Sequence, residues 1–234
     1  MNSQPSAPRL PVSAGQQPVL RWTVASFVLL VLWDFSGLDL WMAHWFGNRN
    51  GFALEAHWFW RDALHDRIRH LPWLLELALL IAIGLPFGNL KKISRARRAQ
   101  FGLTTLAALL VVSGIKTWSN TSCPWDLQQF GGVANYISHW ALGVKDGGNG
   151  GCFPAGHASA GFAFIGGFIA FRHSVPTSAW RWFAGAMLVG LILGIAQQVR
   201  GAHYMSHTFW TAWLCWTSAA LIDNGVSRLI ARKR

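Results

Sequence analysis

The sequence predicts an all-α fold: a polytopic membrane protein with six transmembrane helices. Hydrophobic residues make up 52% of the 234 residues and charged residues only 12%, whereas a soluble domain carries about 25% charge. The 20 basic residues outnumber the 9 acidic ones, which in so apolar a chain is typical of basic loops on the cytoplasmic side of a membrane. This composition argues against a soluble enzyme, a disordered chain or a collagen-like fibre, and we expect no nucleic-acid partner.

Six apolar segments approach the roughly 20 residues that a helix needs to cross a bilayer. They are Val19–Met42, Leu71–Phe87, Phe101–Ile115, His157–Phe171, Trp182–Gln198 and Tyr204–Ile222. Residues 1–18 are rich in Ser, Pro and Gln and predict a disordered tail, followed by one membrane domain over residues 19–234. The first apolar segment lacks a clear small-residue cleavage site, so we expect no cleaved signal peptide.

The distribution of basic residues predicts the orientation of the chain. Residues 91–98 contain five positive charges and no acid, and the last seven residues contain four positive charges. Thirteen of the 20 basic residues fall on the side of the termini, which places both termini in the cytoplasm by the positive-inside rule. Residues 43–70, 116–156 and 199–203 are then external. Within them, Trp58–His70 mixes apolar and charged residues and is expected to lie along the interface.

Three polar motifs fall on the predicted external face: Lys116–Asp126, Cys152–His157 and Gln197–His207. Each has a simpler explanation by itself. Lys116 is typical of a snorkelling lysine at the end of a span, and Arg200 of an anchor. His203 and His207 lie four residues apart and suit either a polar seam or a metal site. The convergence of all three motifs on one face nevertheless favours a functional site.

The residue types in these motifs indicate phosphate chemistry. Lys116 and Arg200 supply fixed positive charge, and an arginine holds two phosphate oxygens at once. Gly156 allows backbone N–H groups to approach an anion at the start of a helix. His157 and His203 supply a proton donor and a nucleophile near neutral pH.

The order and spacing of the motifs resemble the phosphatidic acid phosphatase type 2 family, which is related to the vanadium haloperoxidases. That family carries Lys-x6-Arg-Pro, then Pro-Ser-Gly-His, then Ser-Arg-x5-His-x3-Asp. In this chain Lys116 is followed after six residues by Cys123 and Pro124, and the second motif reads Pro-Ala-Gly-His, ending at His157. The resemblance covers residues 101–222 and implies the helical core of that family. The two altered motifs resemble a divergent bacterial branch.

The third motif departs most from the family pattern. With His203 in the place of the nucleophilic histidine, His207 stands where the family has Asp and Gln197 where it has Arg. A second register makes His207 the nucleophile and puts Thr211 at the Asp position. We favour His203, because the run from Gly201 to His207 follows the Gly-x-His-x3 order of the family.

The resemblance implies a metal-independent lipid phosphatase without a cofactor, in the bacterial inner membrane with its site facing the periplasm. Its partners are then membrane lipids and a lipid phosphomonoester or diphosphate, hydrolysed through a phosphohistidine. By this resemblance His203 attacks phosphorus with His207 as its partner, and His157 protonates the leaving oxygen. The residues expected to hold or orient the phosphate are Lys116, Arg200, Gly156, Gln197 and Asp126.

Several alternatives stay open from the sequence. Asp126 is equally suited to a structural cap. A lipid phosphotransferase and a non-catalytic phospholipid-binding or transport protein share the same motifs. A metal site made by the three histidines is disfavoured by the neighbouring cations. The lipid itself is undetermined among phosphatidic acid, phosphatidylglycerol phosphate, undecaprenyl diphosphate and lipid A, and so is the oligomeric state.

The cysteines and the remaining ionisable residues complete the predictions. Cys123 and Cys152 are both expected on the external side, where an oxidising compartment permits a disulfide between them. Two free thiols are the alternative. Cys215 is expected to pack within the core. Asp34 and Asp39 are acids inside an apolar segment and therefore candidates for a function, but we favour packing or hydrogen bonding to the core. Interfacial or loop positions are expected for His44, His57, His65, His70, His139 and His173.

Overall fold

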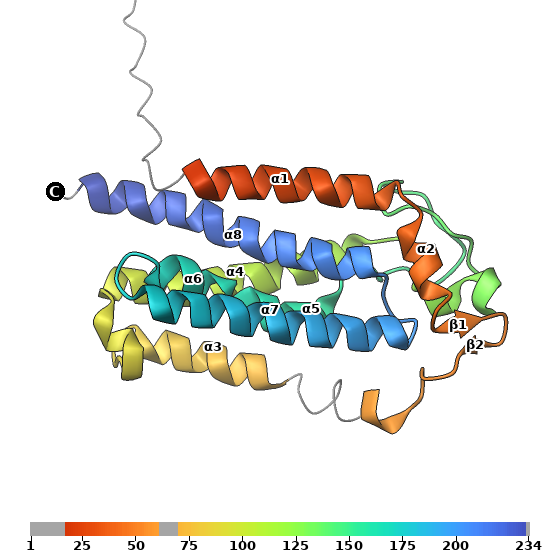
Figure 1. The fold of residues 1–234 in the computed structure, drawn as a ribbon, viewed down its shortest axis with the longest axis horizontal. Coiled ribbons are helices and arrows are strands. Elements are labelled where there is room, and N and C mark those ends of the chain that lie inside the picture. Colours follow the sequence, from red (N-terminus) through yellow and green to blue (C-terminus); the bar gives the residue numbers. More distant parts are fainter. Residues whose placement is uncertain (1–16, 61–69, 233–234) are drawn as a thin grey trace, which may run out of the picture.

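The computed structural model describes residues 17–60 and 70–232, which form an elongated helical bundle (Figure 1). Its helices are α1 (Gln17–Asp34), α2 (Leu38–Ala43), α3 (Leu71–Ala82), α4 (Arg95–Trp118), α5 (Gly156–Phe162), α6 (Gly166–Phe171), α7 (Pro176–Val199) and α8 (Met205–Arg232). Two short antiparallel strands, β1 (Gly47–Asn48) and β2 (Gly51–Phe52), form a hairpin. Short 3-10 turns are η3 (Gly88–Lys92), η4 (Pro124–Asp126), η5 (Gln128–Phe130) and η6 (Ala163–Ile165). The predicted all-α class is confirmed.

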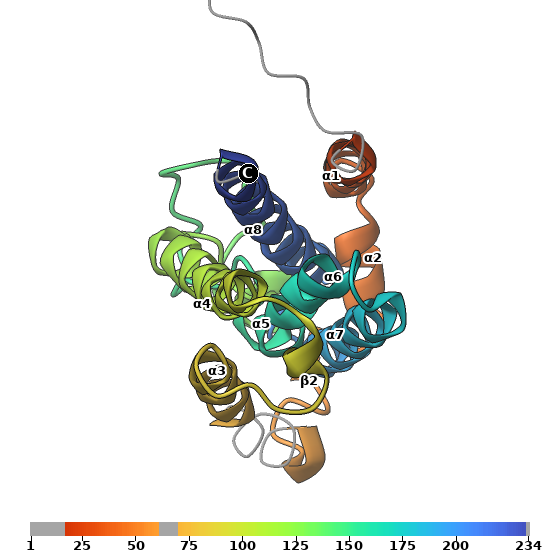
Figure 2. The same ribbon diagram turned by 90° about the vertical axis from the view of Figure 1, so that its left-hand side faces the viewer.

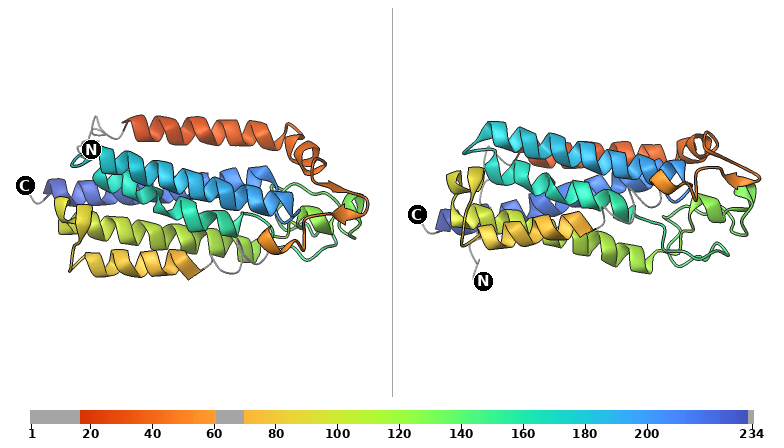
Figure 3. Two further views of the ribbon diagram at one scale, coloured as in Figure 1. Left: turned by 60° about the horizontal axis from the view of Figure 1, so that its bottom comes forward. Right: turned by 90° about the horizontal axis from the view of Figure 1, so that it is seen from below.

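The connections between the helices lie at the two ends of the bundle. The start of α1, the α3–α4 connection, the α6–α7 turn and the end of α8 lie at one end (Figures 1 and 3). The α2 helix, the β-hairpin and the long segment between α4 and α5 lie at the opposite end. We call the latter the loop end. In the end-on view, α1 lies beside α8 and α3 beside α4 at the periphery (Figure 2).

Two of the described helices, α4 and α7, are long and apolar enough to cross a membrane by length and composition, with 24 residues each. The α3 helix and the segment Gly156–Phe171 are apolar but shorter. Crossing of a membrane therefore stays a prediction for all six segments. Most of the predicted tail, residues 1–16, and most of the predicted interfacial stretch, residues 61–69, lie outside the described residues.

Two predicted spans are not continuous helices. The predicted span Val19–Met42 is divided because α1 ends at Asp34 and the backbone turns through Gly37, whose φ of +74° suits glycine. The span His157–Phe171 is divided by the 3-10 turn η6. The adjoining α6 packs so closely that a Cβ at Gly167 would lie 2.6 Å from the Trp182 ring. Tight interhelical packing, which no hydropathy pattern shows, accompanies this break.

The main core lies between α4, α5, α6, α7 and α8 and is built on aromatic residues such as Phe101, Phe162 and Phe171. The α5 and α7 helices approach closely at Gly161, where a Cβ would lie 2.2 Å from the Gly190 nitrogen. A second buried cluster lies within the loop end and consists of Ala43, Phe52, Leu127, Phe130, Ala134 and Tyr204. Tyr204 directly precedes α8, so this cluster adjoins the helical bundle.

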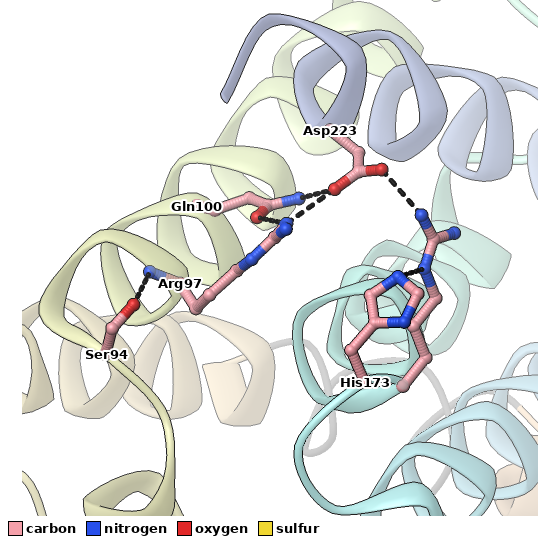
Figure 4. Close-up of polar contacts among 6 residues, drawn as sticks. Ser94, Arg97, Gln100, His173 and Asp223 are labelled. Carbon is pink, nitrogen blue, oxygen red and sulfur yellow. Dashed lines mark hydrogen bonds and ion pairs between the residues drawn. The ribbon is translucent and has the colours of Figure 1, made fainter. Parts of the chain in front are cut away.

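A buried acid joins three elements at the end opposite the loop end (Figure 4). Asp223 on α8 accepts hydrogen bonds from Arg97 at 2.6 Å and Gln100 at 2.9 Å, both on α4, and from Arg172 at 2.8 Å. Arg172 also donates from Nε to Nε2 of His173 at 3.0 Å. Two of the basic residues that predicted the orientation therefore also hold helices together.

Candidate active site

The first and second motifs run side by side at the loop end. The Gly151 nitrogen donates to the Ser119 carbonyl at 2.7 Å, and the Cys152 nitrogen donates to the Thr121 carbonyl at 2.9 Å. A disulfide joins Cys123 to Cys152, with 5.2 Å between the Cα atoms. The two cysteines paired from the sequence are thus bonded in the structure, and they tie the loop after α4 to the loop before α5.

The third motif is joined to the second through α8. The Ala155 nitrogen donates to the His207 carbonyl at 3.3 Å, and the Thr211 hydroxyl donates to the Ala155 carbonyl at 3.1 Å. Because the Thr211 hydroxyl also bonds the His207 carbonyl at 2.8 Å, it is engaged with the backbone. This engagement disfavours the register in which Thr211 orients a nucleophilic His207.

Lys116 reaches across the two loops at the end of α4. Its Nζ donates to the Gly151 carbonyl, and its stem passes Gly156, where a Cβ would lie 3.4 Å from the lysine Cδ. A Cβ at this position would only make van der Waals contact with the lysine, so the anion contact expected of Gly156 stays a prediction. His157, the next residue of α5, lies close enough to His203 for electrostatic interaction.

His203 and His207 are buried beside this lysine, with 4% and 1% of their surface exposed. Their ring centroids lie 5.8 Å apart, and Nδ1 of His203 is 3.4 Å from Sγ of Cys152. Burial lowers the pKa of His203 well below its usual value, and the charges of Lys116, His207 and His157 lower it further. His203 is therefore neutral at pH 7 and has an unprotonated nitrogen.

Arg200, Gln197 and Asp126 are held by local partners. Arg200 donates from Nε to the Glu55 carbonyl at 2.9 Å and from Nη1 to Oε1 of Gln197 at 3.3 Å, and its guanidinium lies 5.8 Å from the Trp125 ring centroid. Asp126 accepts the Cys123 N–H at 3.2 Å. This bond gives Asp126 the structural cap role that the sequence left as an alternative.

Two acids that we expected to pack or hydrogen-bond within the core lie close to the third motif. Asp39 accepts the Ser206 N–H and the Trp33 indole N–H, both at 3.0 Å, and so caps the start of α8. Asp34 lies 3.3 Å from Nε2 of His139. Sequence reasoning missed this proximity because a lone acid in an apolar segment carries no signal of its partner.

Two cysteines and one histidine lie close enough together to suggest a metal site, but the cysteines are not free to bind a metal. Ligand atoms of Cys123, Cys152 and His203 lie within 4.8 Å of one another. The two sulfurs are bonded to each other, however, and a metal ligand requires a thiolate. These three residues therefore do not form a metal site in the oxidised chain.

A comparison with protein-family models identifies the family of the chain. The family model of the PAP2 superfamily matches residues 98–230, more than half of the chain and a range that includes all three motifs. The chain belongs to the PAP2 superfamily. This superfamily consists generally of phosphatase-type hydrolases that act on phosphate esters. No curated protein and no solved structure matches the chain significantly.

Proposed function

We propose that this PAP2 protein is a lipid phosphatase of the bacterial inner membrane that hydrolyses a phosphomonoester or diphosphate without a metal. The main support for this proposal is that Lys116, His157 and His203 lie together at one end of the bundle. Large apolar side chains face outward on the helices, among them Leu29 at 67% and Leu188 at 61% exposure. Such faces suit lipid, and the basic end would be cytoplasmic, which puts the site on the periplasmic side.

The proposed reaction proceeds through a phosphohistidine. The neutral His203 imidazole attacks phosphorus, the bond from phosphorus to the lipid oxygen breaks, and protonated His157 donates its proton to that oxygen. Lys116 lies where it can neutralise the charge that spreads over the phosphoryl oxygens. Water then attacks the phosphohistidine while His157 accepts a proton from it, which releases inorganic phosphate and restores both imidazoles.

The third motif supplies the supporting residues of this proposal. The Cys152 sulfur contacts Nδ1 of His203, which leaves Nε2 as the attacking nitrogen. His207 packs beside the nucleophile where the family pattern has an acid. Arg200 and Gln197, which hydrogen-bond each other, are proposed to contribute positive potential near the phosphate.

Phosphate release tests the proposal directly. The purified protein in detergent, with EDTA present, is assayed on phosphatidic acid, phosphatidylglycerol phosphate, undecaprenyl diphosphate and lipid A. We expect turnover of at least one of them.

His203→Ala should abolish this turnover, His207→Ala should slow it, and His173→Ala, at the opposite end of the bundle, should leave it unchanged. Equal and mild effects of the first two substitutions would exclude the phosphohistidine at His203. Binding without phosphate release would favour a phospholipid-binding protein, and transfer to a second lipid would favour a phosphotransferase.

A further inference from the structure

Asp34 and His139 form an acid–imidazole pair beside the third motif. We propose that they are positioning residues for His207, supplying from α1 and the loop end the negative charge that the PAP2 pattern carries within the motif itself. The inference rests on the proposed phosphatase function, which makes His207 the partner of the nucleophile. Three lines of contact carry it: the surroundings of His207, the anchoring of His139, and the anchoring of Asp34.

His207 is held by rings on several sides. Its ring centroid lies 5.2 Å from that of Phe153, 5.2 Å from Tyr204 and 6.0 Å from His139, and each of these rings is nearly perpendicular to it. Its Nδ1 is buried and has no hydrogen-bond partner among the described residues. Ring packing, together with the backbone at Cys152, therefore determines how the imidazole is oriented.

His139 is itself fixed in two ways. Its ring stacks on Phe153 with centroids 4.1 Å apart and planes inclined by 5°. Its Nε2 lies 3.3 Å from Oδ2 of Asp34, and its side chain is only 9% exposed. This approach does not have hydrogen-bond geometry, so it adds close electrostatic contact to the stacking and does not fix a tautomer. The stacked pair of His139 and Phe153 thereby becomes a rigid surface for His207.

Asp34 is held more firmly than packing alone requires. Its Oδ2 accepts the indole N–H groups of Trp140 and Trp210, each at 2.9 Å, and its side chain is 3% exposed. These donors come from the loop end and from α8, so the last residue of α1 joins three separate elements. A buried carboxylate is costly unless it is paired and hydrogen-bonded, and here the partners lead to the imidazole beside His207.

The arrangement accounts for the altered third motif. A histidine at position 207 cannot supply the negative charge of an Asp beside the phosphorylated imidazole. The contacts run from Asp34 to His139, from His139 to His207 and from His207 to His203. They place a carboxylate two rings away from the nucleophile, in a buried setting where charge is poorly screened.

Isosteric substitutions separate charge from packing. Asp34→Asn keeps the size of the side chain and an oxygen for the indoles, and His139→Phe keeps the stack on Phe153. On a substrate that the wild type hydrolyses, each should lower kcat about 10- to 100-fold, the size of loss seen when a metal-bound histidine loses its outer partner, with KM nearly unchanged. The double variant should be little worse than either single one. Asp34→Glu should recover part of the loss.

A spectroscopic measurement tests the pair without relying on turnover. In protein labelled with 15N at the histidine rings, Asp34→Asn should shift the imidazole signals of both His139 and His207. As a control, Asp223→Asn changes the buried acid at the opposite end (Figure 4) and should leave these signals in place. If the wild type hydrolyses no phosphate ester, the proposed function fails, while the ring signals still decide whether the pair governs His207. The inference would be overturned if Asp34→Asn left the ring signals of His139 and His207 unchanged, or if the substitutions changed only KM. It would also be overturned if the loss of kcat in the double variant were the product of the two single losses.

Discussion

The disulfide between Cys123 and Cys152 offers the sharpest test of how the site is held together. It closes a loop with a sequence separation of 29 residues. Chain-entropy theory gives such a cross-link about 3.6 kcal/mol of stability at 25 °C. Because 1.4 kcal/mol is a factor of ten in an equilibrium constant, its removal should raise the unfolded fraction by a few hundred-fold. The free energy of unfolding of a Cys123→Ser, Cys152→Ser double variant should fall accordingly.

Removal of the disulfide should lower catalytic activity as well as stability. Cys152 lies against His203 and is hydrogen-bonded to Thr121, so the freed loop should also lower kcat under conditions where the chain stays folded. Denaturant unfolding in detergent, followed by far-UV circular dichroism, measures the first effect, and phosphate release measures the second. The control is Cys215→Ala, which removes the buried cysteine that forms no disulfide.

The outcome of this experiment bears directly on the proposed site. Thiol titration of the denatured, unreduced chain should find one free thiol, and reduction should reveal two more. A loss of less than about 1 kcal/mol, well below the range typical of native disulfides, would refute the reasoning. Unaltered kcat in the folded double variant would show that the Cys152 contact does not position His203.

Three further predictions follow from the described contacts. Lys116→Gln should lower kcat by about 100-fold, as loss of one charge-stabilising donor does elsewhere, and a steady-state assay in which kcat is unaffected would contradict its role. The free energy of unfolding should fall as the pH drops below about 6.5, the ordinary pKa of a histidine, because the unfolded chain then binds a proton that the buried His203 imidazole excludes. Unfolding measured at several pH values checks this. His203→Gln should make the free energy of unfolding depend less on pH. Asp223→Asn should destabilise the protein by about 3 kcal/mol by leaving Arg97 and Arg172 without their acid; thermal unfolding checks this, with KM as the quantity expected to stay constant.

Much of the fold and part of the site were predictable from local patterns. Apolar runs predicted the helices because burial along a helix requires consecutive apolar residues, and the boundaries of α4 and α7 differ from the prediction mainly at their polar ends. The motif spacing predicted which residues would stand at one end of the bundle. The structure brings Lys116, Gly156, His157, His203 and His207 together there, while their catalytic roles stay predictions.

By itself, the sequence determined the helical class, the order of the helices and the composition of the three motifs, since these depend on residues close together in the chain. Only the tertiary structure decided that Asp34 meets Trp210, 176 residues away, and lies beside His139. It also decided that Asp223 meets Arg97, 126 residues away. Such pairings depend on which faces of the helices meet, and that is determined by close contacts such as those of Gly161 and Gly167. Hydropathy and spacing do not encode these contacts, because the same apolar pattern permits several rotations of each helix.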